Sequence, residues 1–267
     1  MSAKRIASRE NPLVKDLARL ARSSRAQRTE RVALLDGPHL IAAFAKTGQT
    51  ARTIVVSDAG LSAREARELF ERTPATERVI VADSLFDSLS PVANPVGLLA
   101  CIDLPTKDAL PAVIGDAVVL DRLQEPGNVG AILRTAAAAG VTTIIATPGT
   151  AYLWSTKVMR AAMGAHFGVR GMQLFEDIEI ETLRAKIAGA VVATVLDATN
   201  DLYALDLRAP TVWLFGNEGE GLSTAARSVA TTLARIPMPG ASESLNVAAS
   251  AAVCLFEQMR QRRAVTP

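Results

Sequence analysis

Aromatic residues, cysteines and histidines are scarce in this chain. Aromatic side chains make up only 4% of its 267 residues, which argues against a sheet that binds nucleotide bases by stacking. Cys101 and Cys254 are too few for a disulfide framework or a cysteine metal site. His39 and His166 do not occur in an HExxH spacing and leave little material for zinc chemistry. We therefore predict no metal site.

Long apolar segments are also scarce. The uncharged stretch at 135–156 is broken by Gly140, Pro148 and Gly149, so it does not resemble a membrane span. The first residues are polar and basic and lack the apolar core of a signal peptide. These features predict a cytoplasmic protein with no membrane partner.

The formal net charge is only +2, but the charge is unevenly distributed. Residues 1–31 hold nine lysines and arginines against three acidic residues. A basic segment of this kind attracts phosphate backbones. An ordinary solvated helix face has the same composition, so charge alone leaves both interpretations open.

The first part of the chain alternates short apolar runs with helical patterns. The apolar runs begin at Val32, Thr53, Arg78 and Gly97. Helical spacing occurs at 38–48 and 62–73. We predict a small α/β domain at 1–104, followed by a linker at 105–115, where prolines and mixed polarity indicate a boundary.

The second part, at 116–267, alternates in the same way, and its central apolar runs are continuous. These runs begin at Ala117, Thr142, Ala190, Thr211 and Ala234. Continuous apolar strands are typical of a parallel sheet that is covered on both faces. Ligands bind beyond the carboxyl ends of such strands, so the loops that follow them are the candidate sites.

The first candidate loop is "LDRLQEPGNVGAILRTA", which begins at Leu120. Asn128 is a good N-cap for the helix that follows. The predicted buried stripe of this helix consists of Val129, Ile132, Leu133, Ala136 and Ala137. Arg134 lies off this stripe, which fits a solvated arginine and a functional one equally well.

The second loop, "WLFGNEGEGLS" from Trp213, combines three glycines with two carboxylates. Glycine lets the backbone approach a ligand closely. The carboxylates make the loop a poor phosphate cradle, and it matches neither GxGxxG nor GxxxxGK[ST]. We predict a pocket for a ligand with hydroxyls or positive charge, in preference to a plain turn.

The third loop is "IPMPGASESLN", which begins at Ile236 and precedes a helix with no charge from Val247 to Phe256. Ser244 or Asn246 can serve as its N-cap. The uncharged, alanine-rich helix predicts burial on nearly every side, with the polar residues at the mouth of the core.

These loops resemble the three sequence motifs of the SpoU (TrmH) family of RNA ribose methyltransferases, in the SPOUT superfamily. "EPGNVGAILRTA" resembles the first motif, "LFGNEGEGLS" the second and "IPMPGASESLNVAASAAV" the third, in family order. "STKVMRAAMGAHF" is similar to the segment between motifs, and the first part of the chain to a small substrate-binding domain. Glu125 differs from the usual aspartate, and 248–250 has fewer hydroxyls than is common.

The resemblance implies an α/β fold with a deep trefoil knot formed by the second and third motifs, S-adenosylmethionine as the cofactor, and a homodimer formed through the C-terminal domain. At matching positions it implies that the cofactor is bound by Gly216, Ile236 and Leu245. It also implies a polar catalytic cluster made of Asn128, Arg134, Glu218, Ser244 and Asn246.

The implied reaction is methyl transfer to a ribose 2′-hydroxyl. Because arginine is always protonated, we interpret Arg134 as a fixed cation that stabilises developing alkoxide charge and pairs with the adjacent phosphate. Asn128 and Asn246 would orient this arginine or the ribose. Glu218 would either hold Arg134 or accept the proton.

A separate N-terminal domain favours a large folded target, so we predict ribosomal RNA in preference to transfer RNA. A non-catalytic RNA-binding protein is the alternative, and it would not bind S-adenosylmethionine. A dehydrogenase or an open-sheet methyltransferase requires a glycine fingerprint that "EPGNVG" lacks. A Ser-His hydrolase requires a histidine beside a nucleophile elbow, which neither histidine provides.

Overall fold

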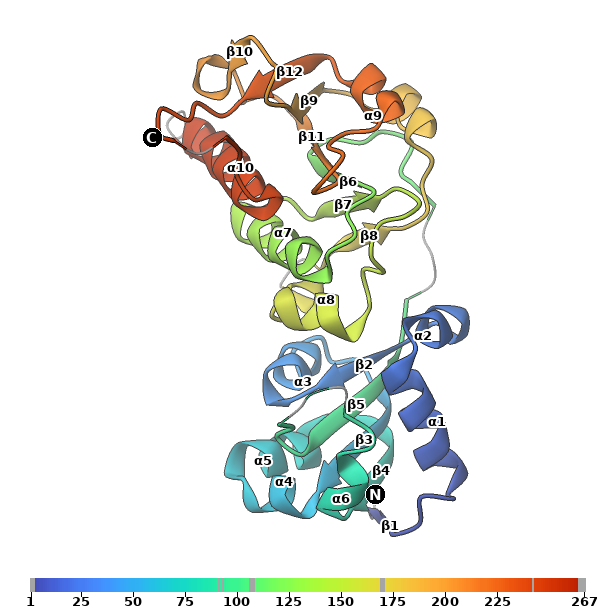
Figure 1. The fold of residues 1–267 in the computed structure, drawn as a ribbon. Coiled ribbons are helices and arrows are strands. Elements are labelled where there is room, and N and C mark those ends of the chain that lie inside the picture. Colours follow the sequence, from blue (N-terminus) through green and yellow to red (C-terminus); the bar gives the residue numbers. More distant parts are fainter. Residues whose placement is uncertain are drawn as a thin grey trace. The chain divides into compact units, whose positions relative to one another are not determined.

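The computed structural model describes residues 3–90, 92, 94–105, 109–168, 171–241 and 243–263. These residues form two compact units (Figure 1). The first unit lies within 1–106 and 154–167, and the second within 107–153 and 168–267. The division at 106 falls in the predicted linker at 105–115, of which residues 106–108 lie outside the described part of the chain.

The first unit is built on a mixed five-stranded sheet with the order β1-β4-β3-β5-β2. Strand β5 pairs antiparallel with β2 and β3, and β4 pairs parallel with β1 and β3. The strands are β1 (Lys4–Ile6), β2 (Val32–Asp36), β3 (Ala51–Ser57), β4 (Ala75–Val81) and β5 (Leu98–Asp103). The helices are α1 (Pro12–Arg22), α2 (Ser24–Glu30), α3 (Pro38–Ala45), α4 (Asp58–Ser62), α5 (Arg64–Arg72), α6 (Asp83–Phe86) and α8 (Thr156–Ala161).

Helices cover both faces of this sheet. Along β2, Ala33 and Leu35 join the core formed with α3 and α5, while Val32 and Leu34 join the core formed with α1 and α6. This alternation follows from the period of two in a strand. The prediction of a small α/β unit at the start of the chain is confirmed.

Residues 154–167 pack with the first unit, although the sequence assigns them to the domain at 116–267. Met159 on α8 is buried in the core shared with α3 and α5. Phe167 contacts Phe44 edge to face, with ring centroids 5.5 Å apart. Gln27 donates to the Thr156 hydroxyl at 3.4 Å. The structure thus differs from the predicted domain boundaries in this segment. Residues 154–167 belong to the first unit because apolar side chains such as Met159 pack into its core.

The second unit is an all-parallel seven-stranded sheet with the order β10-β12-β9-β11-β6-β7-β8. Its strands are β6 (Ala117–Asp121), β7 (Thr143–Ala146), β8 (Gln173–Phe175), β9 (Ala190–Thr194), β10 (Asn200–Asp201), β11 (Thr211–Gly216) and β12 (Thr232–Arg235). Its helices are α7 (Pro126–Ala139), α9 (Thr224–Val229) and α10 (Val247–Arg263). The predicted parallel sheet is confirmed.

Helices α7 and α10 lie side by side on one face of this sheet, and α9 lies on the other (Figure 1). Helix α7 buries Val129, Ile132, Leu133 and Ala136, as its spacing predicts, whereas Ala137 is only half-buried. On the opposite face, Ala226 and Val229 of α9 pack against the strands.

The expectation that α10 is buried on nearly every side is wrong for the described chain. Ala251, Cys254 and Leu255 are buried, but Ala249 is exposed and Phe256 keeps 44% of its surface exposed. Leu245, just before the helix, is 39% exposed. Ala249 and Phe256 lie seven positions apart, about two helical turns, so they share one uncharged face that the described part of the chain leaves uncovered, and Leu245 extends this face four positions before Ala249.

Asp116 fastens the C-terminal half of α10 to the sheet. Its carboxylate accepts hydrogen bonds from both terminal nitrogens of Arg262 at 2.6 and 2.8 Å, from the Thr211 N–H at 2.9 Å, and from Gln258 at 3.1 Å. Gln258 in turn accepts from the indole N–H of buried Trp213 at 2.8 Å. Burial raises the pKa of Asp116, but the bonds from Arg262 and Thr211 outweigh it and hold the pKa below the ordinary value.

We expect Asp116→Asn to lower the free energy of unfolding at pH 7 by about 1 kcal/mol, because the side chains of the ion pair keep 32% and 31% of their surface exposed to solvent, which screens the interaction. A lowered folded-state pKa contributes stability above the unfolded pKa, and this stability is lost as the pH falls through the folded pKa. Urea unfolding should therefore show a difference from the wild type at pH 7 that shrinks below about pH 4. Asp87, which is exposed and lies in the other unit, is the control. Asp87→Asn should leave the free energy of unfolding unchanged both at pH 7 and below about pH 4. An equal difference at both pH values would contradict this role.

Candidate functional site

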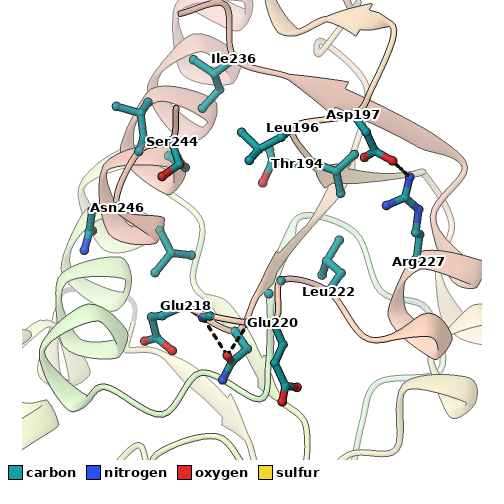
Figure 2. A pocket seen from close by; sticks show the side chains of 18 of the residues that line it. Thr194, Leu196, Asp197, Glu218, Glu220, Leu222, Arg227, Ile236, Ser244 and Asn246 are labelled. Carbon is teal, nitrogen blue, oxygen red and sulfur yellow. Dashed lines mark hydrogen bonds and ion pairs between the residues drawn. The ribbon is translucent and has the colours of Figure 1, made fainter. Parts of the chain in front are cut away.

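A cavity of about 660 Å³ lies at the carboxyl ends of three neighbouring strands of the second unit. Thr194 ends β9, Gly216 ends β11, and Ile236 follows β12. The cavity is lined by residues 194–197, 216–222, Arg227, Ile236, Met238, 244–247 and Ser250. Figure 2 shows Ser244, Asn246 and Glu218 on one side of the cavity and the ion pair of Asp197 with Arg227 on the other. This is the edge of the sheet at which parallel strands place ligand sites.

Residues 217–221 form a closed turn, the glycine loop, on one wall of the cavity. Asn217 and Gly221 exchange backbone hydrogen bonds at 2.9 Å, and the Asn217 side-chain oxygen accepts from the N–H groups of Gly219 and Glu220 (Figure 2). Gly216 passes so close to the far side of the turn that a Cβ there would lie 2.4 Å from the backbone of Gly221. The loop can close only because residue 216 lacks a side chain.

A chain of hydrogen bonds joins all three motifs of the sequence. Asn246 donates to the Asn128 oxygen at 2.9 Å, and Asn128 donates to the Glu218 carboxylate at 3.0 Å. The Asn246 oxygen also accepts from the N–H groups of Ala248 and Ala249, so Asn246 caps α10. Each amide has one orientation that satisfies these partners, which fixes the polar edge of the site.

Glu218 is held as a carboxylate by the loop that precedes α7. Besides Asn128, it accepts from the N–H groups of Gln124 and Glu125 at 3.3 and 3.2 Å. Burial raises the pKa of Glu218, but the hydrogen bonds from Asn128 and from these backbone groups together lower it below the ordinary value. A carboxylate stabilised in this way is a weak proton acceptor. By accepting from the Asn128 side chain, Glu218 instead holds that amide in position.

Asn128 is not the N-cap of its helix, which corrects the sequence prediction. Helix α7 begins at Pro126, and Glu125 caps it by accepting from the Gly127 N–H at 3.2 Å. Proline is favoured at the first helical position because it lacks an N–H that would need a partner. The Asn128 side chain is thereby free to reach Glu218 and Asn246.

The residues predicted for the site do not all meet in one chain. Gly216, Ile236, Leu245, Ser244, Asn246 and Glu218 line the cavity, and Asn128 contacts it through Asn246. Arg134 is exposed, is not a lining residue, and makes no ion pair with Glu218 among the described residues. It lies six positions after Asn128, about 9 Å along the helix axis and about 120° around it. Ser242 lies outside the described residues.

Several lining residues were missed by the sequence interpretation. Thr194 ends β9, and Leu196 and Asp197 follow it; the sequence of β9 contains no glycine and no charged residue. Arg227 on α9 donates to Asp197 at 2.6 Å. Only the rule that ligands bind beyond strand ends could have indicated them. Arg122 was also missed, although it directly follows β6 and pairs with Glu220 at 2.7 Å.

The cavity combines an apolar wall with carboxylates. Leu196, Leu222, Ile236, Met238 and Leu245 provide the apolar surface, while Glu218 and Glu220 lie on the glycine loop. Such a cavity accommodates a flat apolar group together with a positively charged one. Among the described residues, no cluster of three or more His, Cys, Asp or Glu side chains could hold a metal ion. No helix among them is long and apolar enough to cross a membrane.

Comparison with known proteins agrees with this geometry. Residues 116–256 match the model of the SpoU rRNA Methylase family. The chain is 32% identical to an uncharacterized tRNA/rRNA methyltransferase of Synechocystis, over 98% of this chain and 95% of that protein. It is 30% identical to a 23S rRNA (uridine(2479)-2′-O)-methyltransferase of Streptomyces viridochromogenes, over 86% and 83%. The crystal structure of an AdoMet-bound rRNA methyltransferase from Sinorhizobium meliloti superposes with a TM-score of 0.80 at 30% identity, covering 99% of both chains.

Proposed function

The chain belongs to the SpoU rRNA methylase family and is an S-adenosylmethionine-dependent RNA 2′-O-ribose methyltransferase, and we propose that its substrate is ribosomal RNA. The observation that carries this assignment is the convergence of all three motifs on one cavity through Asn246, Asn128 and Glu218. The family also implies a trefoil knot in the second unit.

The cavity fits the cofactor that the family implies. Gly216 leaves room for a closed glycine loop that a Cβ would disrupt, and the two carboxylates of that loop suit a sulfonium cation. The apolar residues Ile236 and Leu245 suit the adenine ring. When bound, S-adenosylmethionine supplies a methyl group on a positively charged sulfur. We propose that Gly216, Ile236 and Leu245 hold it.

The polar residues then act on the RNA. Asn246 and Ser244 face the cavity and would orient the ribose, while Asn128 and Glu218 keep Asn246 in place. Glu218 has a positioning role, because its hydrogen bonds favour the carboxylate and weaken it as a base. Arg134 would stabilise the negative charge that develops on the 2′-oxygen and pair with the neighbouring phosphate.

A homodimer explains how Arg134 reaches a cavity that it does not line in its own chain. The uncharged face of Leu245, Ala249 and Phe256 is exposed in the described chain, its first residue, Leu245, lines the cavity, and α7 packs against α10. Covering this face with a second copy would bury its apolar surface. We propose that each subunit supplies Arg134 to the cavity of its partner.

The first unit, which contains the predicted domain at 1–104, would bind the RNA outside the reacting nucleotide. Several of its basic residues are already paired, such as Arg5 with Asp58 at 2.8 Å. Arg22 and Arg25 on α1 and α2 are exposed and make no ion pair among the described residues, so they are free to meet phosphates. A ribosomal substrate also fits a cytoplasmic location.

The decisive experiment maps ribose methylations in total RNA from cells with and without this protein. We expect one position of ribosomal RNA to lose its methyl group and to regain it when the gene is restored. Loss of a transfer-RNA position would overturn the proposed substrate and keep the chemistry. Unchanged maps, together with no heat of S-adenosylmethionine binding in calorimetry, would support a non-catalytic RNA-binding protein.

A further inference from the structure

Arg122 has a backbone conformation that its residue type disfavours. It directly follows β6, and its φ is 57°, in the left-handed region that glycine occupies most readily. A residue with a side chain pays about 1 kcal/mol or more to stay there. An arginine at this position therefore indicates that its side chain makes contacts that offset the strain.

The contacts of Arg122 reach two neighbouring loops. Its N–H donates to the Thr147 hydroxyl at 3.0 Å, and its carbonyl accepts from the Asn217 side chain at 2.9 Å. Its guanidinium donates to the Glu220 carboxylate at 2.7 Å. The aliphatic stem lies over Gly149, where an added Cβ would be 3.7 Å from the Arg122 Cγ. Arg122 thus joins the loop after β7 to the glycine loop.

The glycine loop depends on such external contacts for its position. Its internal hydrogen bonds all involve the backbone or the side-chain oxygen of Asn217, so they fix the shape of the loop but not its position above the sheet. Outside contacts come from Glu218, which bonds to the start of α7, and from Asn217 and Glu220, which bond to Arg122. Glu220 and Asn217 line the cavity, whereas Arg122 does not.

We propose that Arg122 is a positioning residue that holds the glycine loop in its cofactor-binding place through Glu220. The proposal rests on the proposed function, since it takes S-adenosylmethionine as the ligand of the cavity. The Arg122 and Glu220 side chains are 36% and 70% exposed, so their ion pair adds little to folding stability. The ion pair instead fixes the position of the glycine loop, which lines the proposed cofactor cavity.

The test uses the full-length protein and four variants: three single substitutions and one double variant. Arg122→Gly removes the side chain, keeps the carbonyl that accepts from Asn217, and relieves the backbone strain. We expect calorimetry to show a Kd for S-adenosylmethionine about three- to tenfold higher, an unchanged kcat at saturating cofactor, and a melting temperature that does not fall. Glu220→Gln should raise the Kd equally, and the double variant should be no worse than either. Arg122→Lys should restore most of the affinity.

The matched control is Arg208, an exposed arginine that pairs with Asp206 at 2.6 Å elsewhere in the second unit. Arg208→Gly should leave the Kd unchanged. An unchanged Kd in Arg122→Gly would overturn the proposal, as would a rise in the KM for RNA alone, which would make Arg122 an RNA contact. If the wild-type protein itself does not bind S-adenosylmethionine, the proposed function fails instead.

Discussion

Gly216→Ala should raise the Kd for S-adenosylmethionine at least about tenfold, or about 1.4 kcal/mol. The new Cβ would lie 2.4 Å from the carbonyl carbon of Gly221 and 2.4 Å from the Leu222 nitrogen. These are backbone atoms, so no side-chain rotation relieves the contact, and the glycine loop must shift or open. Isothermal calorimetry measures the affinity, and circular dichroism checks that the protein is folded.

Two other glycines separate a loss of binding from a loss of folding. At Gly189 a Cβ would lie 2.0 Å from the Pro210 carbonyl oxygen, which is an equally severe contact outside the cavity. Gly189→Ala should lower the melting temperature and keep the Kd. At Gly115 a Cβ meets nothing within 4 Å, so Gly115→Ala should change neither. If Gly189→Ala and Gly216→Ala weakened binding equally, the close approach at Gly216 would have no special role in the site.

Much of the fold follows from hydrophobic periodicity, and its failures have physical causes. The apolar runs at Val32, Thr53, Ala117, Ala190 and Thr211 all begin in strands. Strands β1, β8 and β10 have only two or three residues, too few for a repeating pattern to stand out. The segment at 154–167 was assigned to the wrong neighbours because a sequence pattern shows which face of a helix is apolar, not which core that face meets.

The sequence predicted the site residues that lie in the family motifs. It did not predict the features that depend on tertiary packing. Motif positions indicated Asn128, Glu218 and Asn246, and the structure brings these three side chains together. The positive φ of Arg122 could not be expected from an arginine. Likewise, the spacing of α7 places Arg134 off the buried stripe, but only the packing of α7 beside α10 shows that it lies away from the cavity of its own chain.

Replacing Arg134 should reduce methyl transfer more than cofactor binding. Arg134→Lys keeps the charge but loses the planar fork that pairs with phosphate, so kcat should fall at least about tenfold, or about 1.4 kcal/mol of barrier. Arg134→Ala also removes the cation and should lower kcat by about 10²- to 10³-fold. In both variants the Kd for S-adenosylmethionine should stay nearly constant, because Arg134 is proposed to act on the ribose and its phosphate, whereas Gly216, Ile236 and Leu245 hold the cofactor. Full activity in Arg134→Lys would remove this residue from the mechanism.

Mixed dimers decide which subunit uses Arg134. At an S-adenosylmethionine concentration well below the wild-type Kd, Arg134→Ala and Gly216→Ala chains alone each retain little activity, the first because it lacks the cation and the second because it binds the cofactor at least about tenfold more weakly. If Arg134 acts on the partner's cavity, a mixed dimer contains one complete site, because the intact cavity of one chain meets the intact arginine of the other. Random pairing of equal amounts should then restore about a quarter of wild-type activity. If Arg134 acts within its own chain, both sites of the mixed dimer stay defective and activity remains at the level of the separate variants.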